Sequence, residues 1–567
     1  MSVPEPQEQK RDKASRRALR TARILFLYGL LVGGSVVFTL PFLWMIGTSM
    51  KVDREMFTER VRIFPMRPDP APASPYLDTR YFETPREEGF RRIEATLHAA
   101  LDNAEWPAGI RNPDQAPGIL AAGIYQKLKN ILPLSAWTEP DTALCERVEA
   151  AVTPEAINEV IRAVYRRLAF GTVRVRSFEL QEKELTAGRA VSDIWTLPEG
   201  STVRLVDNPA AGTPEAVLMY DFEDNDGEPI VLTADLQIPF KAERLFRFML
   251  SITPDDTWHR VNFSLERNGR KYESTRPAFL GDFQTMVATL QEFGPDDLPD
   301  SNKIKLWYAY QEVDRGSQYD HGEHGVRVTL TLTQSSQLGA WWAKGHRNYR
   351  HALDYIPFWR YVSTSFVLVF LNIVGNIFSC SLVAYAFARL RWPGRNICFG
   401  IMLATMMIPP QVTMIPFFLI IKSVGLYNTL TPLWLLSFFG NAFNIFLLRQ
   451  FMMGIPRDLE DAAKIDGCNF LQVYWYVMMP LIKPTLACIA IFTFMGVWND
   501  FMGPLIFLSD QRLYPLSLGL FALNVQQEGN FGMLMAGSLL MTLPVIIIFF
   551  FAQRYFIQGI TLTGTKG

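Results

Sequence analysis

The chain has 567 residues, of which 49% are hydrophobic and 20% charged, and its 55 Lys and Arg residues nearly balance its 56 Asp and Glu residues. The net charge of −1 excludes a strongly basic nucleic-acid-binding protein, and five cysteines in this length exclude a disulfide scaffold. Hydrophobic residues concentrate towards the two ends of the chain, and charged residues lie between them. The sequence therefore combines two different kinds of structure.

Six segments are long and apolar enough to cross a lipid bilayer, which takes about 20 residues of helix. They lie between Arg23 and Lys51, between Arg360 and Arg389, at Asn396–Ile421, at Ser423–Leu448, at Pro484–Ser509, and between Glu528 and Arg554. The alternative, a set of buried helices in a large soluble core, does not fit six such segments, five of them after residue 360. The sequence predicts an α-helical membrane protein with six transmembrane helices.

The positions of Lys and Arg in the short loops predict the orientation of these helices. Basic residues are frequent in the N-terminal tail, residues 1–23, and in the loops after the second and fourth predicted spans, but rare in the alternate loops. Both termini are therefore expected in the cytoplasm, with the first transmembrane helix at 24–50 and residues 51–355 outside the cytoplasm. The first span is too long for a cleavable signal peptide.

Residues 51–355 are predicted to contain an inserted α+β domain. Between about 86 and 170, apolar residues recur every three or four positions, which is typical of amphipathic helices. From about 171 to 340, apolar and polar residues alternate in short runs separated by turns, which predicts an antiparallel, β-sandwich-like arrangement. Such sandwiches often bind carbohydrate or a partner protein, and the fold alone does not distinguish the two.

All six histidines lie in this insertion or in its connection to the second span, and two of them occur in Asp320-His321-Gly322-Glu323-His324. Four potential ligands in five residues suggest a metal, but the spacing matches no zinc motif, and a solvated loop is the preferred interpretation. No catalytic residue and no metal ligand is predicted. Trp341 and Trp342 are expected at the membrane interface, where Trp is enriched, or alternatively stacked on a sugar.

The connection between the fourth and fifth spans, about 454–483, is unusually long and predicts two short helices on the cytoplasmic side. Pro456 suits a helix start, and Gly467 allows the chain to turn into a second helix. Ala462 and Ala463 leave a small face for close packing, and the acidic residues before them favour a helix N-terminus. Such a pair of helices predicts a docking element; the alternative is an ordinary amphipathic connector.

This connection resembles the EAA motif of ABC importer permeases, which reads Glu-Ala-Ala, three residues, Gly, nine residues, Ile-x-Leu-Pro. Here the sequence reads Asp461-Ala462-Ala463, three residues, Gly467, nine residues, and Val477-Met478-Met479-Pro480. Asp461 stands where the family usually has Glu, and Glu460 precedes it. The segments MIPPQVTMIPFF and TFMGVWNDFMGPLIFL also resemble the carbohydrate, MalG-like branch of that family. The resemblance covers about residues 20–80 and 350–567, but not the insertion.

The resemblance implies one permease subunit of a binding-protein-dependent ABC importer of a sugar or related carbohydrate, with a type I importer permease fold whose core is residues 356–567. The implied partners are a second homologous permease subunit, a dimer of ATP-binding-cassette ATPase subunits, an extracytoplasmic solute-binding protein, the carbohydrate and the lipid bilayer, with no nucleic acid. ATP and Mg would be bound by the ATPase, so this chain is expected to hold no cofactor and to be no enzyme. The bacterial cytoplasmic (inner) membrane is the expected location.

The same resemblance implies which residues couple the permease to the ATPase: Glu460, Asp461, Ala462, Ala463, Asp466 and Gly467. For a translocation pathway, the candidates are polar residues of the spans, mainly Gln411, Asn441, Asn444, Asn499 and Asp500, together with Asn372 and Asn376. Polar groups inside a bilayer are costly and usually face protein or a water-filled cavity. For any single Asn, hydrogen bonding between helices is the alternative.

Two other functions stay open from the sequence alone: a membrane-anchored extracytoplasmic glycan-binding or sensor protein, and an exporter. The insertion contains no nucleophile elbow, and the spacing of the EAA-like motif argues against an exporter. The C-terminal sequence has P-loop-like glycines at Gly559 and Gly564, but Lys566 comes one residue late and no strand precedes it. The insertion is expected either to enlarge the docking surface for a binding protein or to bind glycan itself.

Overall fold

The computed structural model describes residues 6–56, 62–78, 80–82, 85–101, 116–179, 181–198, 200–208, 213–281, 285–292, 308–314, 319, 322–526 and 530–561. The chain divides into two compact units. The first, residues 1–65, 299–304 and 348–567, is called the membrane unit because it holds the long apolar helices; the second, residues 66–298 and 305–347, is called the insertion.

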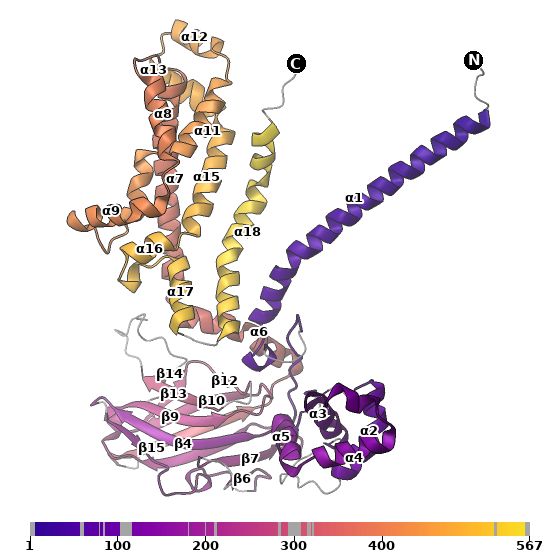
Figure 1. Ribbon diagram of the computed structural model, residues 1–567. Coiled ribbons are helices and arrows are strands. Elements are labelled where there is room, and N and C mark those ends of the chain that lie inside the picture. Colours follow the sequence, from indigo (N-terminus) through magenta and orange to yellow (C-terminus); the bar gives the residue numbers. More distant parts are fainter. Residues whose placement is uncertain are drawn as a thin grey trace. The chain divides into compact units, whose positions relative to one another are not determined.

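The membrane unit is built from helices (Figure 1). Their bounds are α1 Pro6–Ser49, α7 Phe358–Ala388, α8 Arg395–Thr405, α9 Pro410–Ser423, α10 Thr431–Leu435, α11 Ala442–Met453, α12 Asp458–Ile465, α13 Phe470–Gln472, α14 Met479–Leu481, α15 Lys483–Trp498, α16 Met502–Phe507, α17 Leu516–Gln526 and α18 Phe531–Thr561, while α6, Gln337–Tyr355, runs into this unit from the insertion. Four helical stretches of the described chain are long and apolar enough to cross a bilayer. Two bent helix pairs bring the number to six if each pair is one span. Helical membrane spans are thus confirmed, whereas the count of six depends on those pairs.

One of the bent pairs is the predicted third span. The chain turns by 96° between α8 and α9, where Pro409 and Pro410 lack backbone donors and disfavour a helical conformation of the residues before them. The predicted fifth span, Pro484–Ser509, is wrong at its C-terminal end because α15 stops at Trp498. There the Asp500 carboxylate accepts the backbone N–H of Gly503 at 3.1 Å and starts the separate helix α16.

The first helix begins earlier than predicted. α1 is one helix of 44 residues that includes most of the basic tail, since Glu, Gln, Lys, Arg, Ala and Leu in the tail all favour helix. The chain after its last turn is held by Asn348, whose side-chain amide donates to the carbonyls of Ser49 (3.0 Å) and Lys51 (2.7 Å). α18 contacts α1, and its Gly532 leaves no room for a side chain because a Cβ there would lie 2.4 Å from Asn348 Nδ2.

The insertion begins with a helical part. Its helices are α2 Glu88–Leu101, α3 Ala116–Ile131, α4 Asp141–Ala151 and α5 Pro154–Val164. The apolar residues of α2 that recur at helical spacing, Phe90, Ile93, Leu97 and Leu101, are all buried and join one hydrophobic cluster with α3, α4 and α5. The amphipathic helices predicted for this region are present because this shared core covers their apolar faces.

The rest of the insertion is mainly strand. The bounds are β1 Ala73–Ser74, β2 Tyr76–Leu77, β3 Tyr165–Arg166, β4 Leu168–Ser177, β5 Glu182–Glu184, β6 Arg204–Asp207, β7 Ala216–Asp221, β8 Ile230–Gln237, β9 Leu245–Thr253, β10 Arg260–Arg267, β11 Arg270–Ser274, β12 Ala278–Phe279, β13 Met286–Glu292, β14 Tyr308–Asp314 and β15 Gly325–Thr333. Thirteen strands form one hydrogen-bonded sheet in the order β1-β7-β4-β9-β13-β14-β11-β10-β15-β8, with β5, β6 and β12 at its sides, and β2 pairs with β3. The expectation of purely antiparallel pairing is wrong at β13–β14, which pair in parallel.

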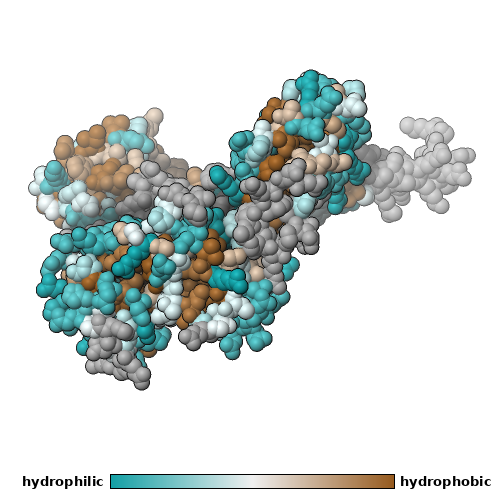
Figure 2. Space-filling model, turned by 90° about the horizontal axis from the view of Figure 1, so that it is seen from below, coloured by the Kyte–Doolittle hydropathy of each residue, from teal (hydrophilic) through white to brown (hydrophobic). Residues whose placement is uncertain are grey.

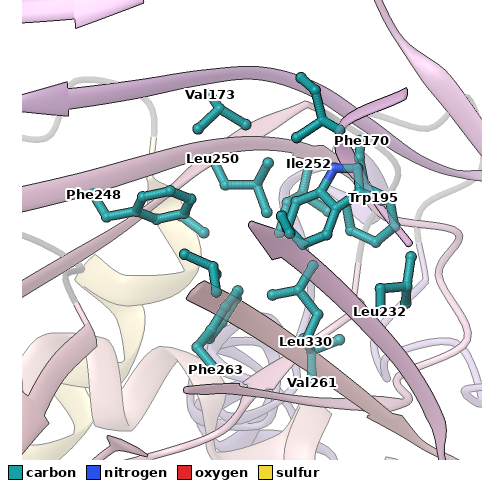
Figure 3. Packing of buried hydrophobic residues seen from close by; sticks show 14 of the residues in the cluster. Phe170, Val173, Trp195, Leu232, Phe248, Leu250, Ile252, Val261, Phe263 and Leu330 are labelled. Carbon is teal, nitrogen blue, oxygen red and sulfur yellow. The ribbon is translucent and has the colours of Figure 1, made fainter. Parts of the chain in front are cut away.

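The hydrophobic core of this sheet lies between two parts of it that face each other. Side chains of β4 and β9, such as Phe170 and Leu250, point towards those of β8, β10 and β15, such as Phe263 and Leu330 (Figure 3). Along β10 every second residue is buried, which is the alternation predicted from the sequence. The surface of the insertion in the foreground of Figure 2 is largely hydrophilic with smaller hydrophobic areas.

A loop of buried polar residues, Asp255–His259, joins the leading segment of the insertion to the sheet. The Asp255 carboxylate accepts hydrogen bonds from the hydroxyls of Tyr220 and Thr257, both at 2.7 Å, and the Tyr76 hydroxyl donates to the Asp255 carbonyl at 2.9 Å. All four residues are buried, so each bond satisfies a group whose burial is otherwise costly. Burial and the neighbouring acids raise the pKa values of Tyr76 and Tyr220, which keeps both hydroxyls protonated.

His259 connects the first and last segments of the insertion through its two ring nitrogens. Nε2 lies 2.8 Å from the carbonyl oxygen of Ala71, and Nδ1 accepts the backbone N–H of Ser335 at 3.2 Å. The ring is therefore neutral, with its proton on Nε2. Burial lowers the pKa of His259, and the nearby Asp255 opposes this effect only in part.

Acid is expected to weaken this connection. The folded-state pKa of His259 lies below its usual value of 6.5. The hydrogen bonds of the neutral ring therefore stabilise the insertion fully above about pH 6.5, and this stabilisation is lost as the pH falls towards the folded-state pKa. In that window the free energy needed to separate the His259 ring from Ala71 and Ser335 falls by about 1.4 kcal/mol per pH unit. Hydrogen–deuterium exchange at the Ser335 amide in the full chain measures this free energy. His259→Gln, which keeps a donor and an acceptor but does not titrate, should remove this pH dependence; equal dependence in both proteins would contradict it.

Candidate functional site

The connection between α11 and α15 forms a compact element at one end of the membrane unit (Figure 1). α12 has three acidic residues in its first turn, Asp458, Glu460 and Asp461, which suit the positive end of a helix dipole. It ends at Gly467, whose φ of +87° is disfavoured for other residues. The N–H of Cys468 then bonds to the Ala463 carbonyl at 2.9 Å and closes the last turn.

A second helical segment follows at once. The Asn469 carboxamide accepts the N–H of Gln472 at 2.9 Å, and the Gln472 carboxamide accepts the N–H of Asn469 at 2.8 Å. This capping box starts α13, which continues through a π-helical stretch, Val473–Met478, into α14. The two short helices expected from the sequence are therefore present, with an irregular second one.

A buried ion pair fixes α12 to the end of α7. Arg389, which follows the last residue of α7, places its Nε 2.9 Å from Glu460 Oε1, and the side chains are only 3% and 7% exposed. The same guanidinium donates to the carbonyl oxygens of Ile455, at 2.7 Å, and Met452. One side chain thus joins the end of α7, the end of α11 and the first turn of α12.

Further contacts hold the second helical segment to α7. The Tyr385 hydroxyl donates to the Phe470 carbonyl at 3.2 Å, and the hydroxyls of Ser381 and Tyr474 lie 2.8 Å apart. Ala463 of α12 is buried in a hydrophobic cluster that also contains residues of α7, α11 and α15. A close-packed cluster of this kind does not deform gradually, so movement of α12 requires movement of α7.

The six predicted coupling residues divide into two groups. Glu460 and Ala463 are buried and face α7, whereas Asp461, Ala462, Asp466 and Gly467 are exposed. The carboxylate of Glu460 is paired with Arg389 inside the membrane unit. Asp461 is 63% exposed and pairs with Lys464 at 2.9 Å; the hydrogen bond and charge of Lys464 lower the pKa of Asp461. It therefore presents a negative charge to any partner at neutral pH.

Most of the predicted pathway asparagines form hydrogen bonds inside the membrane unit. Asn441 caps α11 by accepting the N–H of Asn444 at 3.2 Å, and the side chain of Asn444 donates to Asn376 Oδ1 of α7 at 3.5 Å. Asn372 donates to the Leu433 carbonyl at 3.1 Å. These bonds agree with the alternative of polar contacts between helices, and they bring Asn376, Asn441 and Asn444 together.

The remaining pathway candidates lie elsewhere on the unit and are exposed. Gln411 is in the first turn of α9, and Asn499 and Asp500 follow α15. Asn499 donates to the Met495 carbonyl at 2.9 Å, and the Ser517 hydroxyl donates to the Asp500 carbonyl at 2.6 Å. Among the described residues, no hydrogen bond joins Gln411, Asn499 or Asp500 to the group of Asn376, Asn441 and Asn444.

The histidine-containing turn at Asp320–His324 is described only in part. In the histidine-containing turn, Asp320 and His321 lie outside the described residues, while Glu323 pairs with Lys241 at 2.7 Å and His324 Nδ1 lies 3.1 Å from the Ile238 carbonyl. Arg389 was not predicted as a functional residue, because its ion-pair partner is remote in the sequence. Its position directly after the second apolar span was the only available signal.

Comparison with known proteins gives a consistent result. Residues 378–562 match the family model described as binding-protein-dependent transport system inner membrane component. The arabinooligosaccharides transport system permease protein AraQ of Bacillus subtilis (strain 168) is 37% identical over 210 residues, which are 37% of this chain and 74% of that protein. The lactose transport system permease protein LacG of Rhizobium radiobacter is 33% identical over 204 residues, 36% and 73% of the two chains.

A solved chain is also similar. It comes from the crystal structure of a bacterial ABC transporter involved in the import of the acidic polysaccharide alginate, with 30% identity, 37% of this chain and 79% of that chain covered, and a TM-score of 0.33. The residues matched by the family model include the whole of α12 to α14 but none of the insertion.

Breaking the Arg389–Glu460 pair should destabilise the membrane unit. Glu460→Gln or Arg389→Met leaves one buried charge without its counter-ion, at an expected cost of about 3–5 kcal/mol. The double variant Arg389→Met/Glu460→Met should lose less stability than either single variant, because no buried charge remains. Thermal unfolding of the purified chain measures this, with exposed Asp461→Asn as a control that leaves the unfolding temperature unchanged. Simple addition of the two single effects would contradict the pairing.

Proposed function

The chain belongs to the family of binding-protein-dependent transport system inner membrane components, and from this we propose that it is a permease subunit of an ABC importer for a sugar or related carbohydrate. The named relatives that transport oligosaccharides or lactose support the carbohydrate class. In this proposal the chain forms half of a translocation pathway with a second, homologous permease subunit. Two ATPase subunits bind and hydrolyse ATP, and a solute-binding protein delivers the carbohydrate.

The observation that supports this proposal most directly is the fixed position of α12. The ATPase would contact the exposed residues Asp461, Ala462, Asp466 and Gly467, while Glu460 and Ala463 anchor the same helix to α7. Because α12 follows α7 as a rigid body, closure of the ATPase dimer would tilt α7 and the helices packed on it, which is the rigid-body route of alternating access. Glu460 is therefore a positioning residue for this movement.

The pathway is proposed to run beside the polar residues that stay exposed, Gln411, Asn499 and Asp500. Exposed polar side chains of the spans need a partner subunit or water, since a lipid environment would leave their groups unsatisfied. The buried asparagines Asn376, Asn441 and Asn444 would instead keep α7 and α11 together. This division follows from their hydrogen bonds.

We also propose that both termini face the cytoplasm and that the insertion is a sandwich-like module outside it. The distribution of Lys and Arg supports this orientation. The insertion has its own hydrophobic cores and lies outside the residues matched by the family model. It is thus an addition to the permease rather than part of its helical core.

Cysteine labelling tests the orientation. In a chain whose native cysteines are replaced, Glu243→Cys in the insertion and Asp458→Cys at the start of α12 place thiols at exposed positions. A membrane-impermeant maleimide should label position 243 in intact cells and position 458 only after the membrane is opened. The reverse pattern would refute the proposed orientation.

Charge reversal at α12 tests the coupling. Asp461→Lys should reduce copurification of the ATPase and ATP-driven uptake by about tenfold or more, because it reverses the charge that α12 presents at the interface, while lowering the unfolding temperature far less than Glu460→Gln does. Glu243→Lys, the same reversal on the exposed surface of the insertion, serves as the matched control and should leave both readouts intact. Normal uptake with Asp461→Lys would refute the role of this helix.

A further inference from the structure

Two arginines of the membrane unit come together where α8 contacts α11. Arg449 lies four residues before Met453, the last residue of α11, and its guanidinium is over the Phe399 ring of α8, 4.1 Å from the ring centre. Arg395 is the first residue of α8 and lies one helical turn before Phe399, on the same face of the helix. The two positive charges are therefore close enough to repel each other.

Most N–H groups of these two side chains are unused. Arg395 donates one terminal nitrogen to the Leu390 carbonyl at 3.1 Å, while Arg449 forms no hydrogen bond with the described residues, and no described acid pairs with either arginine. The Nε of Arg449 is buried, but the side chain as a whole is partly exposed, which leaves its terminal nitrogens open to a ligand. Contact with Phe399 occupies the face of the guanidinium and not its N–H groups, which point outwards in its plane. A compact anion between the arginines would accept these N–H groups and offset the repulsion.

The aromatic rings around the arginine pair indicate its depth in the membrane. The Phe387 ring of α7 has its centre 5.5 Å from that of Phe399 and 5.7 Å from that of Trp392, and Trp392 donates its ring N–H to the Ala386 carbonyl at 3.4 Å. Trp is enriched at the level of the lipid headgroups, where its ring meets both apolar and polar surroundings. In the proposed orientation this is the cytoplasmic leaflet, whose lipids are in part anionic.

The helices that carry the arginines also expose apolar side chains. α8 has no buried residue, and Ile397 and Ile401 of α8 and Met453 of α11 are each more than half exposed. Apolar side chains at this depth suit lipid tails. The contact between Arg449 and α8 lies one helical turn, about 5 Å, inside the end of α11, whereas α12, the proposed contact of the ATPase, follows beyond that end. A lipid headgroup therefore fits this position better than an acidic segment of the ATPase.

We propose that Arg395 and Arg449 bind the phosphate of an anionic phospholipid at the cytoplasmic side of the membrane. The two guanidinium groups hold the phosphate oxygens, and the Phe399 ring positions Arg449 for this contact. Since one arginine belongs to α8 and the other to α11, the bound lipid joins these two helices beside the coupling element. The site goes beyond the proposed permease function but rests on the membrane orientation proposed with it.

Native mass spectrometry of the purified full-length chain tests the proposal. In a titration with phosphatidylglycerol the native chain should retain one lipid tightly, and in a titration with zwitterionic phosphatidylcholine it should not. Arg395→Gln and Arg449→Gln should each weaken phosphatidylglycerol binding by about tenfold or more, the loss of a charge-assisted hydrogen bond. Arg391→Gln is the matched control, because it removes an exposed arginine of the same loop and should leave the affinity nearly unchanged. Arg395→Gln keeps the contact between Arg449 and Phe399, so it decides the question even where Arg449→Gln fails to fold.

Several outcomes would overturn the proposal. Equal retention of phosphatidylcholine, or native affinity in Arg395→Gln, would remove the role of the arginines. Displacement of the lipid by an excess of inorganic phosphate would assign the pair to a soluble anion, and its displacement by added ATPase subunits would assign the pair to a protein contact. Because the titration measures neither ATP hydrolysis nor transport, its failure is distinct from failure of the uptake assay with Asp461→Lys, which tests the proposed permease function.

Discussion

The membrane unit depends on the ion pair between Arg389 and Glu460. A buried charge is tolerated only when a partner compensates it, so the end of α7 and the first turn of α12 cannot separate without a large cost in free energy. The carbonyls of Met452 and Ile455 bind the same guanidinium, which extends the constraint to the end of α11. A short surface helix, which is also packed through Ala463, becomes a rigid extension of a membrane span. This rigidity is what a separate ATPase subunit would need in order to move the spans.

Local patterns in the sequence were sufficient for much of the fold. The spacing of Phe90, Ile93, Leu97 and Leu101 predicted α2 because a helix buries one face, and Asn268-Gly269 between β10 and β11 adopts positive φ at both residues, as a tight hairpin requires. The features of α12 could likewise be recognised in the sequence: the acidic residues at its start, Ala462 and Ala463, and Gly467 after its end. These features depend on residues that are close in sequence.

Most of what the sequence could not predict depends on distant partners. Glu460 and Asp461 are adjacent acids, and only the position of Arg389 decides that one is buried and the other exposed. β13 and β14 pair in parallel and so join two parts of the sheet. The alternation of apolar and polar residues predicts single strands but not which strands pair. The early end of α15 results from a local hydrogen bond of Asp500 that competes with the helix, although the sequence there is apolar enough to continue. Tertiary contacts overrode the pattern in the first two cases, and a local hydrogen bond did so at the end of α15.

The exposure of α1 has a consequence for how such a protein is made. From Arg20 to Ser49 the most apolar window of the helix has no residue buried by the rest of the described chain, and Leu25, Phe26 and Phe38 are each more than half exposed. Side chains of this kind must be surrounded by lipid tails or by another helix. Until such a helix arrives, this apolar surface faces lipid alone, so the supply of a neighbouring helix would set how long newly inserted chains persist before assembly.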